Sequence, residues 1–493
     1  MLHVSAEAGW PHPPCPLSTA VARGRQIVAI GGGDSIVCLA LKEDETTTLM
    51  NAIDTETLRQ MPPGAAIVRI IEAALAAVDP GHVVRQALQR AALPAGRVRL
   101  LAVGKASVLM AEAVIATIPQ QVSEGIIVTK AAAAHAVRSS VIDPRMTLIE
   151  SGHPVPDAQS LHAGETIARF LAASSADDIV VVLLSGGGSA LMTLPVAGVT
   201  LADIQHLNQL LLASGAPITA INTVRKHLDR VKGGGLARMA YPATLITLIL
   251  SDVVGNAPDV IASGPTVADP STYGDALAIL HRYVPSEQVP PAIMHHLEQS
   301  AEGRWPETAK PGDPIFERVS TTVIGDNTLA AQAALRQAQQ EGFHAAILTT
   351  TLEGEARDVG RFLASIACEM ASSGNPLPRP ACLIVGGETT VTLRGTGHGG
   401  RNQEVALAMV HAMAGLERTA VLTFATDGGD GPTDAAGAIV TGETWQRAQQ
   451  RGCNPTHFLA NNDAYTFFDS LGDLIRIGTT QTNVNDLTLI ITW

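Results

Sequence analysis

A glycine-rich segment flanked by serines is the part of this sequence with the clearest chemical potential. Residues 185–190 read Ser-Gly-Gly-Gly-Ser-Ala and directly follow the apolar run 179–184, so they lie at the end of a predicted buried strand. Glycines 186, 187 and 188 let backbone N–H groups converge on an anion, and the hydroxyls of Ser185 and Ser189 add donors. The turn, which comprises Ser185, Gly186, Gly187, Gly188 and Ser189, is a candidate phosphate or carboxylate site. A tight turn that needs glycine for its backbone angles is the alternative.

Basic residues follow at helical spacing. The segment 219–232 predicts a helix that carries Asn222, Arg225 and Lys226, with Lys232 directly before three glycines. Side chains three and four positions apart share one face of a helix, so these donors could point into a cleft that binds an anion. A solvated helix face is the alternative. Lys105 follows a predicted strand and a glycine at a helix start, where a cation opposes the helix dipole, a placement that structure alone does not explain.

Polar residues also follow glycines in the last third of the chain. Glu388 comes after Gly-Gly at a predicted strand end, and Arg401 lies in GTGHGGRNQE. Asp427 and Asp430 lie in ATDGGDGPTD after another predicted strand. Carboxylates at strand ends suit Mg²⁺ bound to phosphates, and the planar guanidinium of Arg401 suits phosphoryl oxygens. Solvated turn acids are the alternative.

One glycine pattern argues for a different ligand. Gly395, Gly397 and Gly400 spell G-x-G-x-x-G, the fingerprint of dinucleotide-binding turns. The polar residues 401–404 are unsuited to a helix start packed on a dinucleotide-binding sheet, and Glu417 precedes the next strand instead of ending it. We therefore expect no dinucleotide site here.

Composition excludes several classes of protein. The 493 residues carry a net charge of −13, and only 3% are aromatic, which argues against nucleic-acid binding and against docking on anionic membranes. Five scattered cysteines show neither a zinc spacing nor a disulfide framework. No apolar run is long enough for a membrane helix, and the N-terminus lacks the pattern of a secretory signal. We expect a cytoplasmic protein with small-molecule substrates that assembles as a homodimer.

Strands alternate with amphipathic helices from about residue 50 onward, which predicts an α/β fold. We expect two α/β domains, the first a doubly wound, largely parallel Rossmann-like sheet, with the active site in the cleft between them. Residues 1–46 are predicted to be an extension that need not be ordered, 47–310 the first domain, and 311–493 the second. The Pro- and charge-rich interval 302–317 sets that boundary, so the segments 318–326 and 389–394 are predicted as strands of the second domain.

Taken together, the motifs resemble those of the class II glycerate kinases, the glycerate 2-kinases, some of whose bacterial members carry the label hydroxypyruvate reductase. The matching segments are AVGKAS, GHPVPD, LLSGGGSALM, INTVRKHL, VKGGGLA, SDVVGNAPDVIASGPTVADPSTY, VGGETTV, GHGGRNQE, ATDGGDGPTDAAGA and TNVND. The resemblance runs from about Ala65 to the C-terminus and includes a MOFRL-type region from about residue 380.

The resemblance implies an ATP-dependent kinase that phosphorylates D-glycerate at its 2-hydroxyl with Mg²⁺. Its catalytic cations would be Lys105 and Arg401. Asp252 and Asp427, and with them Asp430, would support the metal or act as a base. The remaining candidates would hold glycerate or phosphate; they are Ser185, Gly186, Gly187, Gly188, Ser189, Asn222, Arg225, Lys226, Lys232 and Glu388.

The sequence departs from the family pattern at four positions. Asp229 replaces the usual serine, Gly235 a larger basic residue, Asn256 the usual aspartate and Thr479 the usual proline. Lys105 and Arg401 are kept. An NAD(P)H-dependent hydroxypyruvate reductase and a non-catalytic metabolite-binding protein are the two alternative functions.

Overall fold

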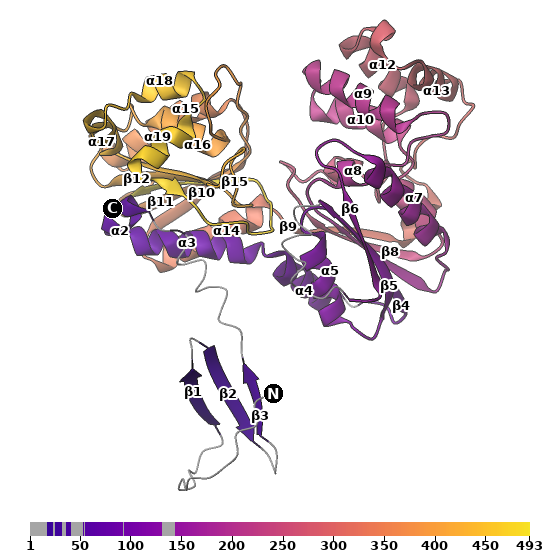
Figure 1. Cartoon of the computed structure of the whole chain (residues 1–493), viewed down its shortest axis with the longest axis horizontal. Coiled ribbons are helices and arrows are strands. Elements are labelled where there is room, and N and C mark those ends of the chain that lie inside the picture. The colour runs from indigo at the N-terminus through magenta and orange to yellow at the C-terminus, as the bar shows by residue number, and fades with distance from the viewer. Residues whose placement is uncertain are drawn as a thin grey trace. The chain divides into compact units, whose positions relative to one another are not determined.

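The computed structural model describes residues 17–22, 25–31, 36–40, 53, 55–91, 93–130 and 143–493, and divides the chain into two units, residues 1–54 and 55–493 (Figure 1). In the first unit, the strands β1 (Leu17–Ala22), β2 (Arg25–Gly31) and β3 (Ile36–Ala40) form an antiparallel sheet in that order. These strands lie in the segment that we predicted as an extension. The parts of residues 1–46 between them lie outside the described residues.

The second unit contains a fully parallel six-stranded sheet. Its strands are β4 (Arg97–Val103), β5 (Val122–Lys130), β6 (Met146–Ser151), β7 (Asp178–Leu184), β8 (Thr244–Leu250) and β9 (Val319–Gly325). They are ordered β6-β5-β4-β7-β8-β9, the strand order of a Rossmann sheet, and this confirms the predicted fold class. Every residue of β7 is buried because both faces of the sheet are covered, which explains its uninterrupted apolar sequence.

Helices cover both faces of this sheet. Figure 1 shows α4 (Pro80–Arg90) and α5 (Ser107–Thr117) on one face and α7 (Ala158–Ala172) and α8 (Gly188–Leu191) on the other. The side chain of Asp157 accepts a hydrogen bond from the backbone N–H of Ser160 and caps α7. The short helix α11 (Gly235–Ala240) packs beside α7. We call this sheet with its helices the first lobe.

Four further helices of the first lobe build a small core of their own. They are α9 (Leu201–Ala213), α10 (Ile218–Leu228), α12 (Tyr273–Tyr283) and α13 (Pro291–Ala301). The 3₁₀ turns η1 (Ile261–Ser263), η2 (Ser286–Gln288) and η3 (Pro314–Arg318) lie between and after them. The helix predicted over 219–232 is therefore too long: α10 ends at Leu228, and residues 229–234 form turns that place Lys232 off the helix.

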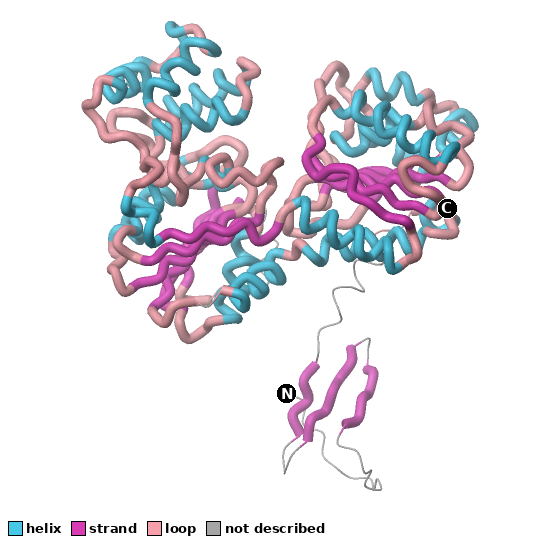
Figure 2. The backbone as a smooth tube through the Cα atoms, turned by 180° about the vertical axis from the view of Figure 1, so that it is seen from behind, coloured by secondary structure: helices cyan, strands magenta, loops and turns pink. Residues whose placement is uncertain are grey.

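The second lobe is built on a mixed sheet. Its strands are β10 (His344–Leu352), β11 (Ala381–Gly387), β12 (Thr419–Ala425), β13 (Gly437–Thr441), β14 (Leu474–Ile475) and β15 (Asp486–Thr492), ordered β10-β11-β15-β12-β13-β14. Only β10 and β11 run parallel. On one face lie α15 (Ala356–Ser373), α16 (Arg401–Met409), α17 (Thr444–Gln450), α18 (Pro455–Ala460) and α19 (Ala464–Leu471). On the other lie α2 (Glu56–Gln60), α3 (Gly64–Ala77) and α14 (Asn327–Gln340) (Figures 1 and 2).

One predicted strand is wrong: the segment 389–394 forms a loop with a single bridge at Thr390. The segment 318–326 contains a strand, as predicted, but this strand, β9, pairs with β8 at the edge of the first sheet. Residues 55–493 form one compact unit, so the division into domains 47–310 and 311–493 stays a prediction. In the described part of the chain, no helix is long and apolar enough to cross a membrane.

Candidate active site

The candidate site lies where the order of the strand connections in the parallel sheet reverses. Strands β4 and β7 are neighbours although α5, β5, β6 and α7 lie between them in the chain, so the order of connections reverses between them. Ligands of open α/β sheets bind at this point, beyond the carboxyl ends of the strands. The backbone N–H of Lys105 donates to the carbonyl of Gly186 (3.0 Å), and the N–H of Ala106 donates to Ser185 Oγ (3.1 Å). The structure thus brings Lys105 beside the glycine-rich turn.

Close packing explains the glycines of this turn. A Cβ on Gly186 would lie 2.2 Å from Asp252 Oδ2, and a Cβ on Gly187 would lie 2.8 Å from His153 Cδ2. Gly187 also has φ 86°, in the left-handed region that favours glycine. The glycines therefore let a carboxylate and an imidazole approach the backbone. Burial, followed by the charges of Lys105 and Lys130, lowers the pKa of His153 to about 4, so this ring is neutral at pH 7.

A chain of hydroxyl and amide groups connects the turn to α10. Ser189 Oγ lies 2.9 Å from Ser263 Oγ, which donates to Asn222 Oδ1 at 3.1 Å. The Asn222 Nδ2 group donates to the carbonyl of Val260 at 3.4 Å. Asn222 is thus connected to the glycine-rich turn through Ser263, so these predicted site residues lie close together.

The two consecutive basic residues of α10 lie in different surroundings. Arg225 Nε donates to Asn208 Oδ1 at 2.8 Å, and its guanidinium has no ion-pair partner among the described residues. It lines a cavity of about 280 Å³ together with Ser189 and Asp252. Lys226 is absent from this lining and forms ion pairs with Asp259 (3.2 Å) and Asp269 (3.5 Å). The structure therefore brings Arg225, but not Lys226, to the turn.

Lys232 is also engaged in an ion pair. Its ammonium contacts the carboxylate of Asp229 and lies 3.3 Å from the carbonyl of Met192, and both charged side chains are buried. Asp229 accepts further hydrogen bonds from Thr193 Oγ1 (2.6 Å) and from the N–H of Leu194 (3.0 Å). The carboxylate of Asp229 therefore neutralises Lys232. The pair lines the same 280 Å³ cavity.

Arg401 is held by two carboxylates in the second lobe. Its Nε and Nη2 donate to the two oxygens of Asp486 at 2.6 and 2.9 Å, and its Nη1 lies 2.8 Å from Glu388 Oε1. Burial by itself lowers the pKa of the Arg401 guanidinium, but the negative charges of Asp486 and Glu388 raise this pKa by more. Burial raises the pKa of Glu388, which also accepts a hydrogen bond from Asn485 Nδ2 at 3.1 Å. Sequence reasoning missed Asp486, although it ends the quoted segment TNVND.

A larger cavity unites the two groups of residues. It has a volume of about 1000 Å³ and is lined from the first lobe by Ser189, Arg225 and Asp252 and from the second by Glu388 and Arg401. Lys105 is not among its lining residues, but its charge acts on both Asp252 and Glu388. One cavity thus offers two arginines and a serine hydroxyl to an anionic ligand.

The three aspartates predicted as metal ligands differ in their surroundings. Burial, together with the nearby charge of Asp427, raises the pKa of Asp252, while Lys105 lowers it. Asp430 is buried, and its two oxygens accept the backbone N–H groups of Asn402 (3.1 Å) and Gln403 (2.8 Å) at the start of α16. In the described residues no three acidic, histidine or cysteine side chains form a metal-binding group. The donors that remain, Asp252 and Asp427, fit Mg²⁺, which commonly takes one or two carboxylates plus water and phosphate oxygens.

The G-x-G-x-x-G pattern serves packing. A Cβ on Gly395 would lie 2.4 Å from the carbonyl of Asn461, one on Gly397 2.3 Å from Asp463 Cβ, and one on Gly400 2.3 Å from Asp430. The pattern also lies within the loop of residues 388–400 instead of directly following a strand. The close contacts explain these glycines without a dinucleotide, although Gly397 and Gly400 also line the 1000 Å³ cavity.

Comparisons with known proteins agree with this geometry. The model of a "Domain of unknown function (DUF4147)" matches residues 66–298, and the model of the "MOFRL family" matches residues 381–486. A glycerate 2-kinase of Pyrococcus horikoshii is 41% identical over 397 residues, which cover 80% of this chain and 87% of that protein. The chain belongs to the glycerate kinase family. As a member of this family it is an enzyme that acts as a kinase.

Two further members extend the comparison. A crystal structure of a glycerate kinase of Thermotoga maritima has a TM-score of 0.79 and 40% identity, and the match covers 87% of this chain and 99% of that one. A protein of Agrobacterium vitis, provisionally named a hydroxypyruvate reductase, is 43% identical over 425 residues, which cover 86% of this chain and 93% of that protein. The family resemblance inferred from the sequence motifs is thereby confirmed.

Proposed function

We propose that this enzyme is a glycerate 2-kinase that transfers the terminal phosphoryl group of ATP to the 2-hydroxyl of D-glycerate, giving 2-phosphoglycerate and ADP. The observation that supports this most strongly is the 1000 Å³ cavity, in which Arg225 and the glycine-rich turn share a space with Arg401 and Glu388. The named relatives support the substrate. We further propose a cytoplasmic homodimer without nucleic-acid or membrane partners.

In this proposal the first lobe holds glycerate. Arg225 is suited to the carboxylate because its guanidinium has no carboxylate partner in the described part of the chain, and burial, which lowers its pKa, makes an anion favourable beside it. Asn222 and Ser189, joined through Ser263, add donors beside it. Glycerate is thereby oriented with its 2-hydroxyl toward Asp252. Asp252 is the base that accepts the hydroxyl proton, since burial raises its pKa and makes it a better proton acceptor.

The cations then act on the transferring group. Phosphoryl transfer depends mostly on positioning and on neutralising the charge of the phosphoryl oxygens. Lys105 reaches the site from the end of β4, and Arg401 reaches it from the start of α16. Glu388 and Asp486 fix the plane of the Arg401 guanidinium before ATP binds. Mg²⁺, when bound through Asp427 together with phosphate oxygens and water, would neutralise phosphate charge and orient the phosphates.

An assay coupled to enolase tests the proposal, because enolase accepts 2-phosphoglycerate directly but not its 3-isomer. Purified enzyme with D-glycerate, ATP and Mg²⁺ gives an enolase signal, and Arg401→Ala abolishes it. Arg476→Ala is the matched control, since this arginine of the same lobe is half exposed and pairs with two exposed acids. ADP without an enolase signal contradicts the 2-position. NADH consumption on hydroxypyruvate without ADP contradicts the kinase and supports the reductase.

A further inference from the structure

A second cavity lies on the opposite side of the Asp229–Lys232 pair from the candidate active site. It has a volume of about 610 Å³, and the pair lines both this cavity and the 280 Å³ cavity. Its other walls come from the end of α10, α11, α12, α13 and the segment 305–308. Lys105, Arg225 and Arg401 do not line it. The cavity is therefore separate from the residues that the proposed reaction uses.

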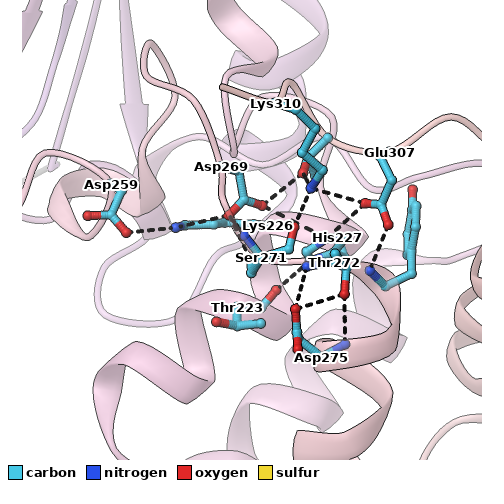
Figure 3. A network of polar contacts seen from close by, with 12 residues as sticks. Thr223, Lys226, His227, Asp259, Asp269, Ser271, Thr272, Asp275, Glu307 and Lys310 are labelled. Atoms are coloured by element: carbon cyan, nitrogen blue, oxygen red, sulfur yellow. Dashed lines mark hydrogen bonds and ion pairs between the residues drawn. The ribbon is translucent and has the colours of Figure 1, made fainter. Parts of the chain in front are cut away.

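A polar network fixes the base of this cavity. Figure 3 shows Lys226 between Asp259 and Asp269, with His227 beside it on the same helix. Asp269 also accepts hydrogen bonds from Thr308 Oγ1 (2.9 Å) and Ser271 Oγ (2.7 Å). These contacts join α10 to the segments around residues 270 and 308. The cavity is thus preformed, which lowers the entropic cost of binding a ligand.

An aromatic wall runs along one side. The ring of Tyr273 lies edge-on to His227, with centroids 4.8 Å apart, and edge-on to His296 at 5.9 Å. Trp305 stacks on His296 at 6.2 Å, with an angle of 29° between the planes, and remains 47% exposed. His296 is buried, and its Nε2 has no hydrogen-bond partner in the described structure.

Two arginines of this cavity are not held in close ion pairs. Lys226 pairs with Asp259 and Asp269, and Lys232 pairs with Asp229, so the charges of both lysines are already balanced. Arg230 is exposed and has no ion-pair partner among the described residues, and Arg238 is 3.8 Å from its nearest carboxylate, that of Asp313. Arginine pairs well with carboxylate, sulfonate or phosphate groups and stacks on flat rings.

We propose that this cavity is a second ligand site, which binds a planar aromatic anion. The ring system stacks on Trp305, and the anionic group lies between Arg230 and Arg238. This site goes beyond the proposed kinase reaction and does not depend on it. Because α10 carries Arg225 toward the active site and His227 toward this cavity, a bound anion contacts the helix that holds the proposed glycerate site.

The test uses 8-anilinonaphthalene-1-sulfonate, an aromatic anion with a planar naphthalene ring system, titrated by calorimetry into the full-length protein. We expect saturable one-site binding, with a dissociation constant raised at least about tenfold in Trp305→Ala and in Arg230→Ala, because each removes one of the two main contacts. Arg282→Ala is the control: this arginine on α12 lies over Tyr283, outside the cavity, and its loss leaves the constant unchanged. Trp305 and Arg230 are both exposed, so these variants are expected to fold.

Saturating Mg-ATP and D-glycerate distinguish the two cavities. The proposal predicts that the probe stays bound in their presence and that Arg401→Ala leaves its affinity unchanged. Displacement by Mg-ATP, absence of saturable binding, or equal affinity in the wild type and both cavity variants would each overturn the proposal. A probe that binds as predicted while the enolase assay stays silent refutes only the proposed 2-kinase reaction, so the two failures are distinguishable.

Discussion

Replacing Asp486 by asparagine isolates the contact that orients Arg401. Asp486 accepts two hydrogen bonds from the guanidinium, at 2.6 and 2.9 Å, and only 10% of its side chain is exposed. An asparagine keeps the shape but loses the charge, and its amide nitrogen faces a guanidinium N–H group. Arg401 is then left with Glu388 alone, at 2.8 Å.

The size of the effect follows from the burial of the pair. Removing one partner of a buried ion pair typically costs about 3–5 kcal/mol, because the other charge is left unpaired. Arg401 keeps 28% of its side chain exposed and retains Glu388, so we expect the lower end, about 3 kcal/mol. If the same energy is lost in the transition state, kcat falls about 100-fold, since about 1.4 kcal/mol corresponds to tenfold.

Two assays measure this prediction. Urea unfolding of Asp486→Asn gives the stability loss, and steady-state kinetics give kcat, while KM for ATP changes by less than about threefold if Arg401 acts mainly in the transition state. Glu388→Gln leaves the two-point contact intact, so its effects are smaller. Asp434→Asn is the surface control, since the Asp434–Arg476 pair is exposed and such pairs contribute about 0–1 kcal/mol. Equal effects in Asp486→Asn and Asp434→Asn would refute the orienting role.

Three further predictions concern other charged groups. In steady-state assays Lys105→Met lowers kcat at least about 100-fold. The variant loses no stability, because the Lys105 ammonium forms no ion pair with the described residues. An unchanged kcat would show that Lys105 does not act in the reaction. Arg225→Gln raises KM for glycerate about tenfold and leaves KM for ATP unchanged, and the reverse pattern would assign Arg225 to the nucleotide. Burial raises the pKa of Asp430 from 3.8 to about 7, so the folded state holds its proton longer and stability falls as pH rises from about 4 to 7. Between pH 5 and 8 the free energy of unfolding falls by up to about 3 kcal/mol more in the wild type than in Asp430→Asn, and parallel curves would contradict the shift.

The order of strands and glycine-rich turns made the centre of the site predictable. The apolar run 179–184 followed by glycines indicated a strand end in a parallel sheet, and the structure places that end beside the end of β4. This adjacency brings Lys105 to the turn. The roles of Lys105 and the turn residues stay predictions.

Contacts between distant segments were not predictable from spacing. Arg225 and Lys226 are consecutive, and only the fold of the segments around residues 259 and 269 decides that Lys226 pairs with acids while Arg225 faces the cavity. Asp430 likewise follows a strand, which is where a metal ligand was expected. In the structure, however, both of its carboxylate oxygens accept hydrogen bonds from backbone N–H groups at the start of α16, some thirty residues earlier in the chain.

The position of β9 at the edge of the first sheet was not predictable for a different reason. Proline and charged residues in 302–317 favoured a domain boundary, and they form an exposed connection that leads back to the edge of the first sheet. An edge strand is paired on one side only, so β9 lacks the uninterrupted burial of β7 and carries a weaker sequence signal.

The position of the transferred phosphoryl group tests the central proposal most directly. The enzyme is incubated with D-glycerate, ATP and Mg²⁺, and the product is examined by phosphorus NMR with proton coupling. Phosphorylation at the 2-hydroxyl predicts a phosphorus signal split into a doublet by the single proton on C2, and ADP in equal amount. A triplet from the two protons on C3, or ADP without a phosphoglycerate signal, would contradict the account.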